Sequence, residues 1–157
     1  MKTKKPKLMM NGHTDEIYTP KYALNPILPY LKKKWVIWEN AWGTGVLAKH
    51  LKEMGFKVSS KEGDIILTNP PYSKKEEFLR KGYESGKPFA YLLPLTALEG
   101  IGRGALFRKY GIQLIIPNRR INFIMPNKQG GSWFQTAWFT WGLNLPKDLN
   151  FVTLSRD

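Results

Sequence analysis

The segment 64–73 constrains the fold of this chain more than any other. Its apolar run at 65–67, Ile-Ile-Leu, is typical of a strand that is buried on both faces of a parallel sheet. The proline pair at 70–71 ends that strand, because proline lacks a backbone donor and fixes the φ angle. The strand therefore presents Asn69 and Tyr72 at its carboxyl edge, where open α/β sheets bind their ligands.

Asn69 and Tyr72 have the chemistry needed to hold a flat amine. The side-chain carbonyl of Asn69, together with a backbone carbonyl before proline, can accept both protons of an exocyclic –NH₂ group. The Tyr72 ring can stack on the ring that carries the amine. Such a grip leaves the nitrogen lone pair free to attack an electrophile. The alternative is a plain proline loop in which Tyr72 only packs.

The four residues Asn69, Pro70, Pro71 and Tyr72 resemble the motif of DNA adenine-N6 methyltransferases of the Asn-Pro-Pro-Tyr type. In that family the tetrapeptide is catalytic, it binds a flipped-out adenine, and S-adenosylmethionine donates the methyl group. The resemblance implies a compact, phage-like, adenine-specific enzyme of DNA methylation or restriction-modification. The same tetrapeptide occurs in methyltransferases for RNA adenine and for a protein glutamine amide. A non-catalytic nucleic-acid-binding domain derived from a methyltransferase is a further alternative.

A strand at 35–39, a Gly-x-Gly turn at 40–45 and a helix to about residue 54 predict the first half of a Rossmann-like cofactor site. The glycines allow a ligand to approach the backbone, and the helix start supplies unpaired N–H groups. The turn resembles the donor loop of the family, although Asn40 replaces its usual proline and Trp42 a small residue. The resemblance assigns S-adenosylmethionine binding to Tyr18, Thr19, Glu39, Asn40, Gly43, Gly45, Glu62 and Asn69.

The connection after the second predicted strand, 56–60, is too short for the family pattern. That pattern places a helix and a further strand before the catalytic strand, whereas this chain has only residues 61–63 there. We therefore predict an α/β, Rossmann-like methyltransferase fold with a reduced, mostly parallel sheet. Glu62 is the only nearby carboxylate for the donor ribose. Because one wall of the adenine pocket is missing, we expect the free protein to bind the donor weakly.

The rest of the chain alternates helical and strand patterns. A Thr-Pro start at 19–20 predicts a helix with Thr19 as its N-cap, shortened or kinked by Pro26 and Pro29. Later elements are predicted at 74–84 (helix), 89–95 (strand), 105–110 (short helix), 112–116, 133–141 and 151–154 (strands).

The composition indicates one domain and a polyanionic partner. We interpret residues 1–13 as a flexible basic arm and 14–157 as one methyltransferase-like domain. The net charge of +13 favours DNA, with RNA possible, and a homodimer is also possible. With no cysteine, two isolated histidines and no long apolar run, we expect no metal, no membrane span and a cytoplasmic protein. The candidate nucleic-acid contacts are Arg103, Arg119, Arg120 and Lys128.

Overall fold

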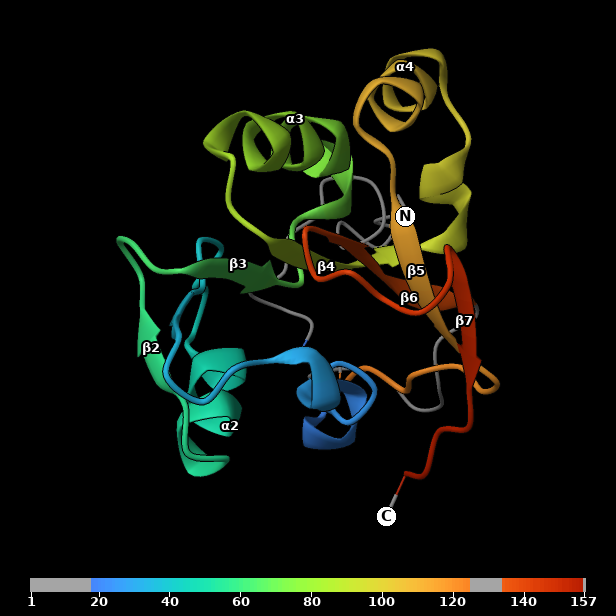
Figure 1. Cartoon of the computed structure of the whole chain (residues 1–157). Helices are drawn as coiled ribbons and strands as arrows, with labels where there is room; N and C mark the ends of the chain where they lie inside the picture. The colour runs from blue at the N-terminus through green and yellow to red at the C-terminus, as the bar shows by residue number, and fades with distance from the viewer. Residues whose placement is uncertain (1–17, 125–133, 157) are drawn as a thin grey trace, which may run out of the picture.

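Seven strands form one sheet in the order β2-β1-β3-β4-β6-β5-β7 within residues 18–124 and 134–156, which this computed structural model describes (Figure 1). Neighbours from β2 to β4 are parallel, as are β5 and β7, whereas β6 runs antiparallel to both β4 and β5. The sheet is therefore mostly parallel, as the sequence predicted. The strands are β1 Val36–Trp38, β2 Lys57–Ser59, β3 Ile65–Thr68, β4 Phe89–Pro94, β5 Gln113–Pro117, β6 Thr136–Trp141 and β7 Leu149–Val152.

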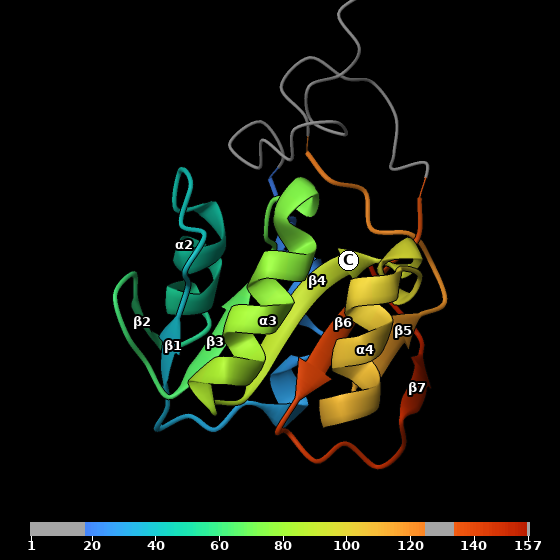
Figure 2. The same cartoon turned by 90° about the horizontal axis from the view of Figure 1, so that it is seen from above.

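Helices cover both faces of the sheet and give a three-layer α/β arrangement. Figures 1 and 2 show α3 (Lys75–Ser85) and α4 (Ile101–Tyr110) on one face. The opposite face carries α2 (Val46–Glu53) and two short 3₁₀ turns, η2 (Lys21–Leu24) and η3 (Leu28–Tyr30). Two further 3₁₀ turns, η4 (Tyr72–Lys74) and η5 (Leu95–Leu98), lead into α3 and towards α4.

Strand β3 is buried along its whole length because both of its faces are covered. Successive side chains of a strand point to opposite faces. Ile65 and Leu67 accordingly pack into the cluster on the α2 side, and Ile66 packs into the cluster on the α3 side. This two-sided burial explains why the sequence of β3 is a continuous apolar run rather than an alternating one.

The connection from β2 to β3 crosses β1 with no helix. β2 and β3 pair in parallel with opposite sides of β1, so residues 60–64 must pass over that strand. The Trp38 indole N–H donates to the Ser60 carbonyl over 3.2 Å, and the Asp64 carboxylate accepts the Val36 N–H over 2.8 Å. The predicted absence of a helix and strand here is confirmed. The sheet still has seven described strands, because β7 extends the opposite edge.

Two helix predictions need correction. The segment after Thr19 forms the 3₁₀ turns η2 and η3 rather than a helix, and Pro20, not Thr19, occupies the N-cap of η2. The Thr19 hydroxyl is used elsewhere, as described below. The short helix expected at 105–110 starts earlier, so α4 spans Ile101–Tyr110.

Some sequence predictions lie outside the described residues. These are the basic arm at 1–13 and the candidate nucleic-acid contact Lys128. In the portion that the structure does describe, no helix has the length and apolar character needed to cross a membrane.

The close contact between α3 and β4 predicts a strong effect of a single methyl group. A Cβ at Gly82 would lie 2.7 Å from Tyr91 Oη and 2.9 Å from Phe89 Cδ2, and both rings are buried. Gly82→Ala should therefore lower the free energy of unfolding by about 1–3 kcal/mol through overpacking.

The matched control is Gly104 in α4, where a Cβ would meet Arg108 Nη1 at an ordinary 3.5 Å. Gly104→Ala should be neutral or stabilise the protein by up to about 1 kcal/mol, because alanine favours helix. Urea unfolding measures both variants. Equal effects of the two substitutions would contradict the packing argument.

Candidate active site

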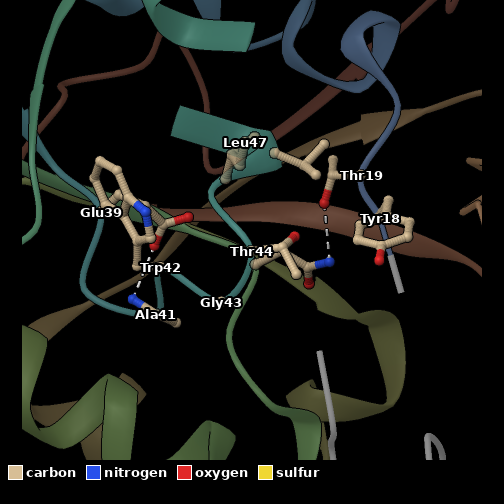
Figure 3. Close-up of a pocket in the computed structure, with 10 residues that line it drawn as sticks. Tyr18, Thr19, Glu39, Ala41, Trp42, Gly43, Thr44 and Leu47 are labelled. Carbon is tan, nitrogen blue, oxygen red and sulfur yellow. Dashed lines mark hydrogen bonds between the residues drawn. The ribbon is translucent and has the colours of Figure 1, made fainter. Parts of the chain in front are cut away.

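The carboxyl ends of β1 and β3 meet at one edge of the sheet, because the two strands pair in parallel. The turn after β1, the residue after β3 and the segment before η2 line a small pocket at that edge (Figure 3). The pocket brings together five of the residues predicted to bind the donor, namely Tyr18, Thr19, Glu39, Gly43 and Asn69. Its other lining residues are Ala41, Trp42, Thr44, Val46 and Leu47.

In the side-chain amide of Asn69, the nitrogen has a hydrogen-bond partner and the oxygen has none among the described residues. Its Nδ2 donates to Thr19 Oγ1 over 3.1 Å, and both residues are buried (6% and 4% exposed). Its Oδ1 has no hydrogen-bond partner among the described residues. A buried carbonyl without a partner is costly, by about 1–3 kcal/mol. The Thr19 contact thus orients the amide so that an acceptor is available to a ligand.

Glu39 is a buried carboxylic acid at the floor of the pocket, with 2% of its surface exposed. Burial raises the pKa of Glu39 to about 7, against the opposing effect of nearby donors such as the Ala41 N–H, which lies 2.8 Å from Oε1. Such a group changes its charge near neutral pH. A cation bound beside Glu39 would favour its ionised form, because the opposite charge offsets the loss of hydration.

Trp42, in the turn after β1, lies over the start of α2. Gly45, the N-cap of α2, has a φ of 83°, and a Cβ there would lie 2.9 Å from Trp42 Nε1. Lys52 Nζ lies 5.3 Å from the centre of the Trp42 ring. Gly45 is therefore needed both for its backbone angle and for the close approach of the indole, although it does not line the pocket.

Tyr72 lies beside the pocket but its ring is packed rather than open. The side chain is 8% exposed, and the edge of Phe134 meets the ring at 5.8 Å between centres. Burial also raises the pKa of the Tyr72 hydroxyl well above its ordinary value. Stacking on a base would require Tyr72 or Phe134 to move.

Two predicted donor residues lie elsewhere. Asn40 lines a second pocket of about 340 Å³ between β1 and α3, which Trp38 and Phe78 also line. The two pockets are therefore separated by the turn after β1. Glu62 is exposed in the β2–β3 connection and lines neither pocket. The structure therefore does not bring Glu62 to the pocket that holds Glu39.

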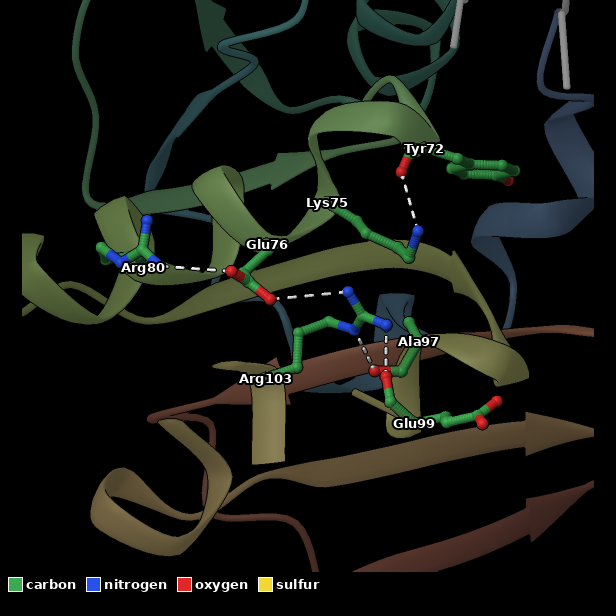
Figure 4. Close-up of polar contacts among 7 residues, drawn as sticks. All are labelled: Tyr72, Lys75, Glu76, Arg80, Ala97, Glu99 and Arg103. Carbon is green, nitrogen blue, oxygen red and sulfur yellow. Dashed lines mark hydrogen bonds and ion pairs between the residues drawn. The ribbon is translucent and has the colours of Figure 1, made fainter. Parts of the chain in front are cut away.

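Arg103 makes several contacts within the protein, and its role as a nucleic-acid contact stays a prediction. Its guanidinium donates to the carbonyls of Ala97 (2.8 Å) and Glu99 and pairs with Glu76 at 3.6 Å (Figure 4). The Arg103 side chain is only 17% exposed. In the same region Lys75 Nζ donates to the Tyr72 carbonyl over 3.1 Å. This network fixes the start of α3 against the start of α4.

Arg119 and Arg120 are exposed and follow β5. Because β5 and β4 both run antiparallel to β6, the carboxyl end of β5 lies at the edge that carries Asn69. The segment 118–124 then runs back to the pocket, where Ile124 forms a bridge with Tyr18. The two arginines therefore belong to a segment that ends at the candidate site.

The sequence analysis missed His50. The His50 Nε2 donates to the Thr19 carbonyl over 3.1 Å and joins α2 to the Thr19 segment. Its position three residues after Leu47, which lines the pocket, was the only available signal. Within the described ranges, no group of three or more His, Cys, Asp or Glu residues could hold a metal ion.

Comparisons with known proteins give a fold but no family. No protein-family model and no curated protein sequence matches this chain. The methyltransferase subunit of a type I restriction-modification system from Streptococcus thermophilus is similar, with a TM-score of 0.56 at 16% identity over 88% of this chain and 47% of that one. A Vibrio vulnificus protein described as a modification subunit of a type I restriction enzyme has a TM-score of 0.51 at 12% identity over 85% and 47%.

This chain thus spans about half the length of those two proteins. At such low identity the comparison concerns the fold alone. The chain has a Rossmann-like methyltransferase fold with a mostly parallel sheet, which confirms the fold predicted from the sequence.

The raised pKa of Glu39 predicts a pH dependence of stability. Between about pH 4.5 and pH 7 the folded state holds a proton on Glu39 that the unfolded state has lost. The contribution of this group is therefore fully present below about pH 4.5 and is lost as the pH rises through 7. Glu39→Gln cannot ionise, so relative to the parent it should gain about 2–3 kcal/mol in unfolding free energy between pH 4.5 and pH 8.

Urea unfolding across that pH range measures the difference between the variant and the parent. Glu84→Gln, which removes an exposed carboxylate from α3, controls for the loss of one charge. Parallel stability profiles for Glu39→Gln and the parent would show that Glu39 ionises normally in the folded state.

Proposed function

We propose that this protein transfers a methyl group from S-adenosylmethionine to the N6 amino group of adenine in DNA. The observation that carries the proposal is the orientation of the Asn69 amide. Its nitrogen is bound by Thr19, and its buried carbonyl oxygen has no partner among the described residues. That oxygen suits one proton of an –NH₂ group, and the backbone carbonyl of Asn69, which precedes Pro70, suits the other.

The pocket at the end of β1 has the features expected for the amino-acid end of the donor. Glu39 offers a buried carboxylate for an ammonium group, and the Thr19 hydroxyl offers a donor for a carboxylate. Gly43 has a φ of 54°, in the left-handed region that glycine favours, and lets a ligand approach the turn. The bound donor would supply an activated methyl group. The apolar pocket between β1 and α3 is suited to its flat ring, since Trp38 and Phe78 line that pocket.

On the substrate side, the protein would hold the amine and exclude water. Two carbonyl acceptors on the two amine protons would leave the nitrogen lone pair free to take the methyl group. The sulfur–methyl bond of the donor would break as the N–C bond forms, leaving S-adenosylhomocysteine, and the nitrogen would then release one proton to water. Pro70 and Pro71 keep the acceptors in place because they restrict the backbone of the turn. Tyr72 would stack on the base after its contact with Phe134 opens.

Charge supports DNA as the substrate. The chain has a net charge of +13, and exposed Arg119 and Arg120 follow a strand that ends at the edge of the site. The similar type I proteins are named as subunits of restriction-modification systems. A base in a duplex must leave its stack to reach Asn69, which costs a few kcal/mol, and contacts to phosphates would offset that cost.

A non-catalytic binding domain is the second candidate, and the packing of two rings favours it. Trp42 lies against Gly45 in the donor loop, and Tyr72 is buried. A domain that only grips nucleic acid would keep both rings in place. Calorimetric titration with S-adenosylhomocysteine separates the candidates, because the enzyme must bind the donor group and the binding domain has no need to.

Asn69→Ala tests the amine grip. The variant should lose at least about a hundredfold in methylation rate, by analogy with the loss of one hydrogen-bonding group at a reacting centre. The measurement is N6-methyladenine formed in DNA, detected by mass spectrometry. The thermal unfolding temperature and DNA affinity should stay close to those of the parent. Turnover within a few-fold of the parent would remove Asn69 from the mechanism.

Replacing Arg119 and Arg120 together with alanine tests the nucleic-acid interface. If both contact phosphates, the slope of log binding constant against log salt concentration should fall in magnitude by about 1–2. The matched control is the double variant Lys34→Ala/Lys57→Ala, which removes two exposed charges at the starts of β1 and β2, the opposite edge. A similar change in both double variants would indicate attraction by overall charge alone.

A further inference from the structure

The hydroxyl of Thr19 lies between the donor pocket and the amide that would hold the substrate. We propose that Thr19 is a positioning residue that couples donor binding to the grip of Asn69 on the substrate amine. This inference rests on the function proposed above, because it concerns the same site. It adds a specific route, one hydrogen-bonded hydroxyl, by which occupancy of one half of the site strengthens the other.

The geometry leaves the Thr19 hydroxyl free to act in both directions. A hydroxyl has one proton and two acceptor lone pairs. Thr19 Oγ1 uses one lone pair to accept Asn69 Nδ2 at 3.1 Å, so its own proton remains available. Thr19 also lines the pocket that contains Glu39 and Gly43. A carboxylate in that pocket can take the proton, and the hydroxyl then links the ligand to Asn69.

The backbone around Thr19 is held from two directions, so the hydroxyl has a defined position. The His50 ring donates to the Thr19 carbonyl over 3.1 Å from α2. On the other side, Tyr18 and Ile124 exchange two backbone hydrogen bonds of 2.8 and 2.9 Å. Thr19 is therefore anchored both to the helix of the donor loop and to the segment that carries Arg119 and Arg120. Because the backbone of Thr19 is fixed, a ligand that binds its hydroxyl should alter the hydrogen bond to Asn69 rather than displace Thr19.

Hydrogen bonds in a chain polarise one another. When the Thr19 hydroxyl donates to an anion, its oxygen becomes a stronger acceptor for Asn69 Nδ2. The polarised amide then carries more negative charge on Oδ1, the atom without a partner among the described residues. Donor binding should therefore strengthen the grip on an amine. By thermodynamic reciprocity, the amine should strengthen donor binding by the same factor.

The same contact decides which end of the amide faces the substrate. With Thr19 Oγ1 as an acceptor, the Asn69 nitrogen is directed to Thr19 and the oxygen to the ligand. Without that acceptor, the amide loses the preference, and the flipped form presents –NH₂ to the substrate –NH₂. Two facing donors repel each other. The loss of the Thr19 hydroxyl should thus lower kcat more than it raises the KM for the donor.

The experiment measures coupling directly. The affinity for S-adenosylhomocysteine is determined by calorimetry alone, with saturating single-stranded oligo(dA), and with oligo(dT) of equal length. The two oligonucleotides carry the same phosphates, but thymine has no exocyclic amine. For the parent, oligo(dA) should tighten the dissociation constant by about fivefold or more, within the usual range for coupled sites, and oligo(dT) should not.

Three substitutions at one position separate positioning from structure. Thr19→Val keeps the shape and removes the hydroxyl, so the coupling factor should fall to about one. Thr19→Ser keeps the hydroxyl and should retain the coupling. Thr19→Ala replaces the valine variant if that variant unfolds. Coupling that persists in a folded Thr19→Val or Thr19→Ala variant would overturn the inference.

Failure of the proposed function gives a different result. A parent protein that does not bind S-adenosylhomocysteine would remove both proposals together. A parent that methylates DNA, binds both ligands and shows equal donor affinity with oligo(dA) and oligo(dT) would overturn the coupling alone. The kcat and KM of Thr19→Ser, measured beside those of Thr19→Val, provide the second readout.

Discussion

The termination of β3 by Pro70 is the constraint on which the site depends. β3 is buried on both faces, and its backbone is paired with β1 and β4, so its position in the molecule is fixed. Proline then ends the ladder at once and leaves Asn69 as a polar residue in a nearly apolar environment. Such a residue must satisfy its hydrogen bonds locally. Among the described residues, Thr19, which lies 50 positions earlier in the chain, supplies a hydrogen bond to the amide nitrogen, while the amide oxygen has no partner.

Glu39 is a second polar group in the site whose burial is not fully compensated by hydrogen bonds. Glu39 is buried at the end of β1 and is left with a pKa near 7, which means that desolvation outweighs its hydrogen bonds. Both Asn69 and Glu39 would be stabilised by a hydrogen-bond or ionic partner that the described residues do not supply. Two ligands, one with an ammonium group beside Glu39 and one with an amine beside Asn69, would supply both partners. A single binding site that includes both Asn69 and Glu39 therefore accounts for their burial better than two unrelated, incompletely hydrogen-bonded groups would.

Features that depend on neighbouring residues could be predicted from the sequence. Side-chain contacts between residues far apart in the sequence could not. The apolar run of β3, the proline pair and the glycine turn each act through their own backbone, so the fold and the placement of Glu39, Gly43 and Asn69 followed from pattern. The contact of Arg103 with Glu76 depends on where α4 meets α3, which the sequence pattern does not reveal. Glu62 was chosen by proximity in sequence, but the crossing over β1 leaves it exposed. Thr19 was read as a helix cap because its partner lies far along the chain.

The short β2–β3 connection packs closely on β1, and this packing accounts for the second pocket, between β1 and α3. Parallel strands on either side of a third usually need a dozen or more residues to cross it. Here residues 60–64 suffice because Gly63 lies directly on β1, where a Cβ would be 2.5 Å from the Val36 carbonyl oxygen. Lys87 Nζ donates to the Gly63 carbonyl over 2.6 Å and closes the far side. The β2–β3 connection therefore adds no helix to this face in the described chain, and the groove lined by Trp38 and Phe78 stays open. The short connection thus leaves an apolar surface beside the turn after β1, and a flat ring bound there would contact side chains that a longer connection could cover.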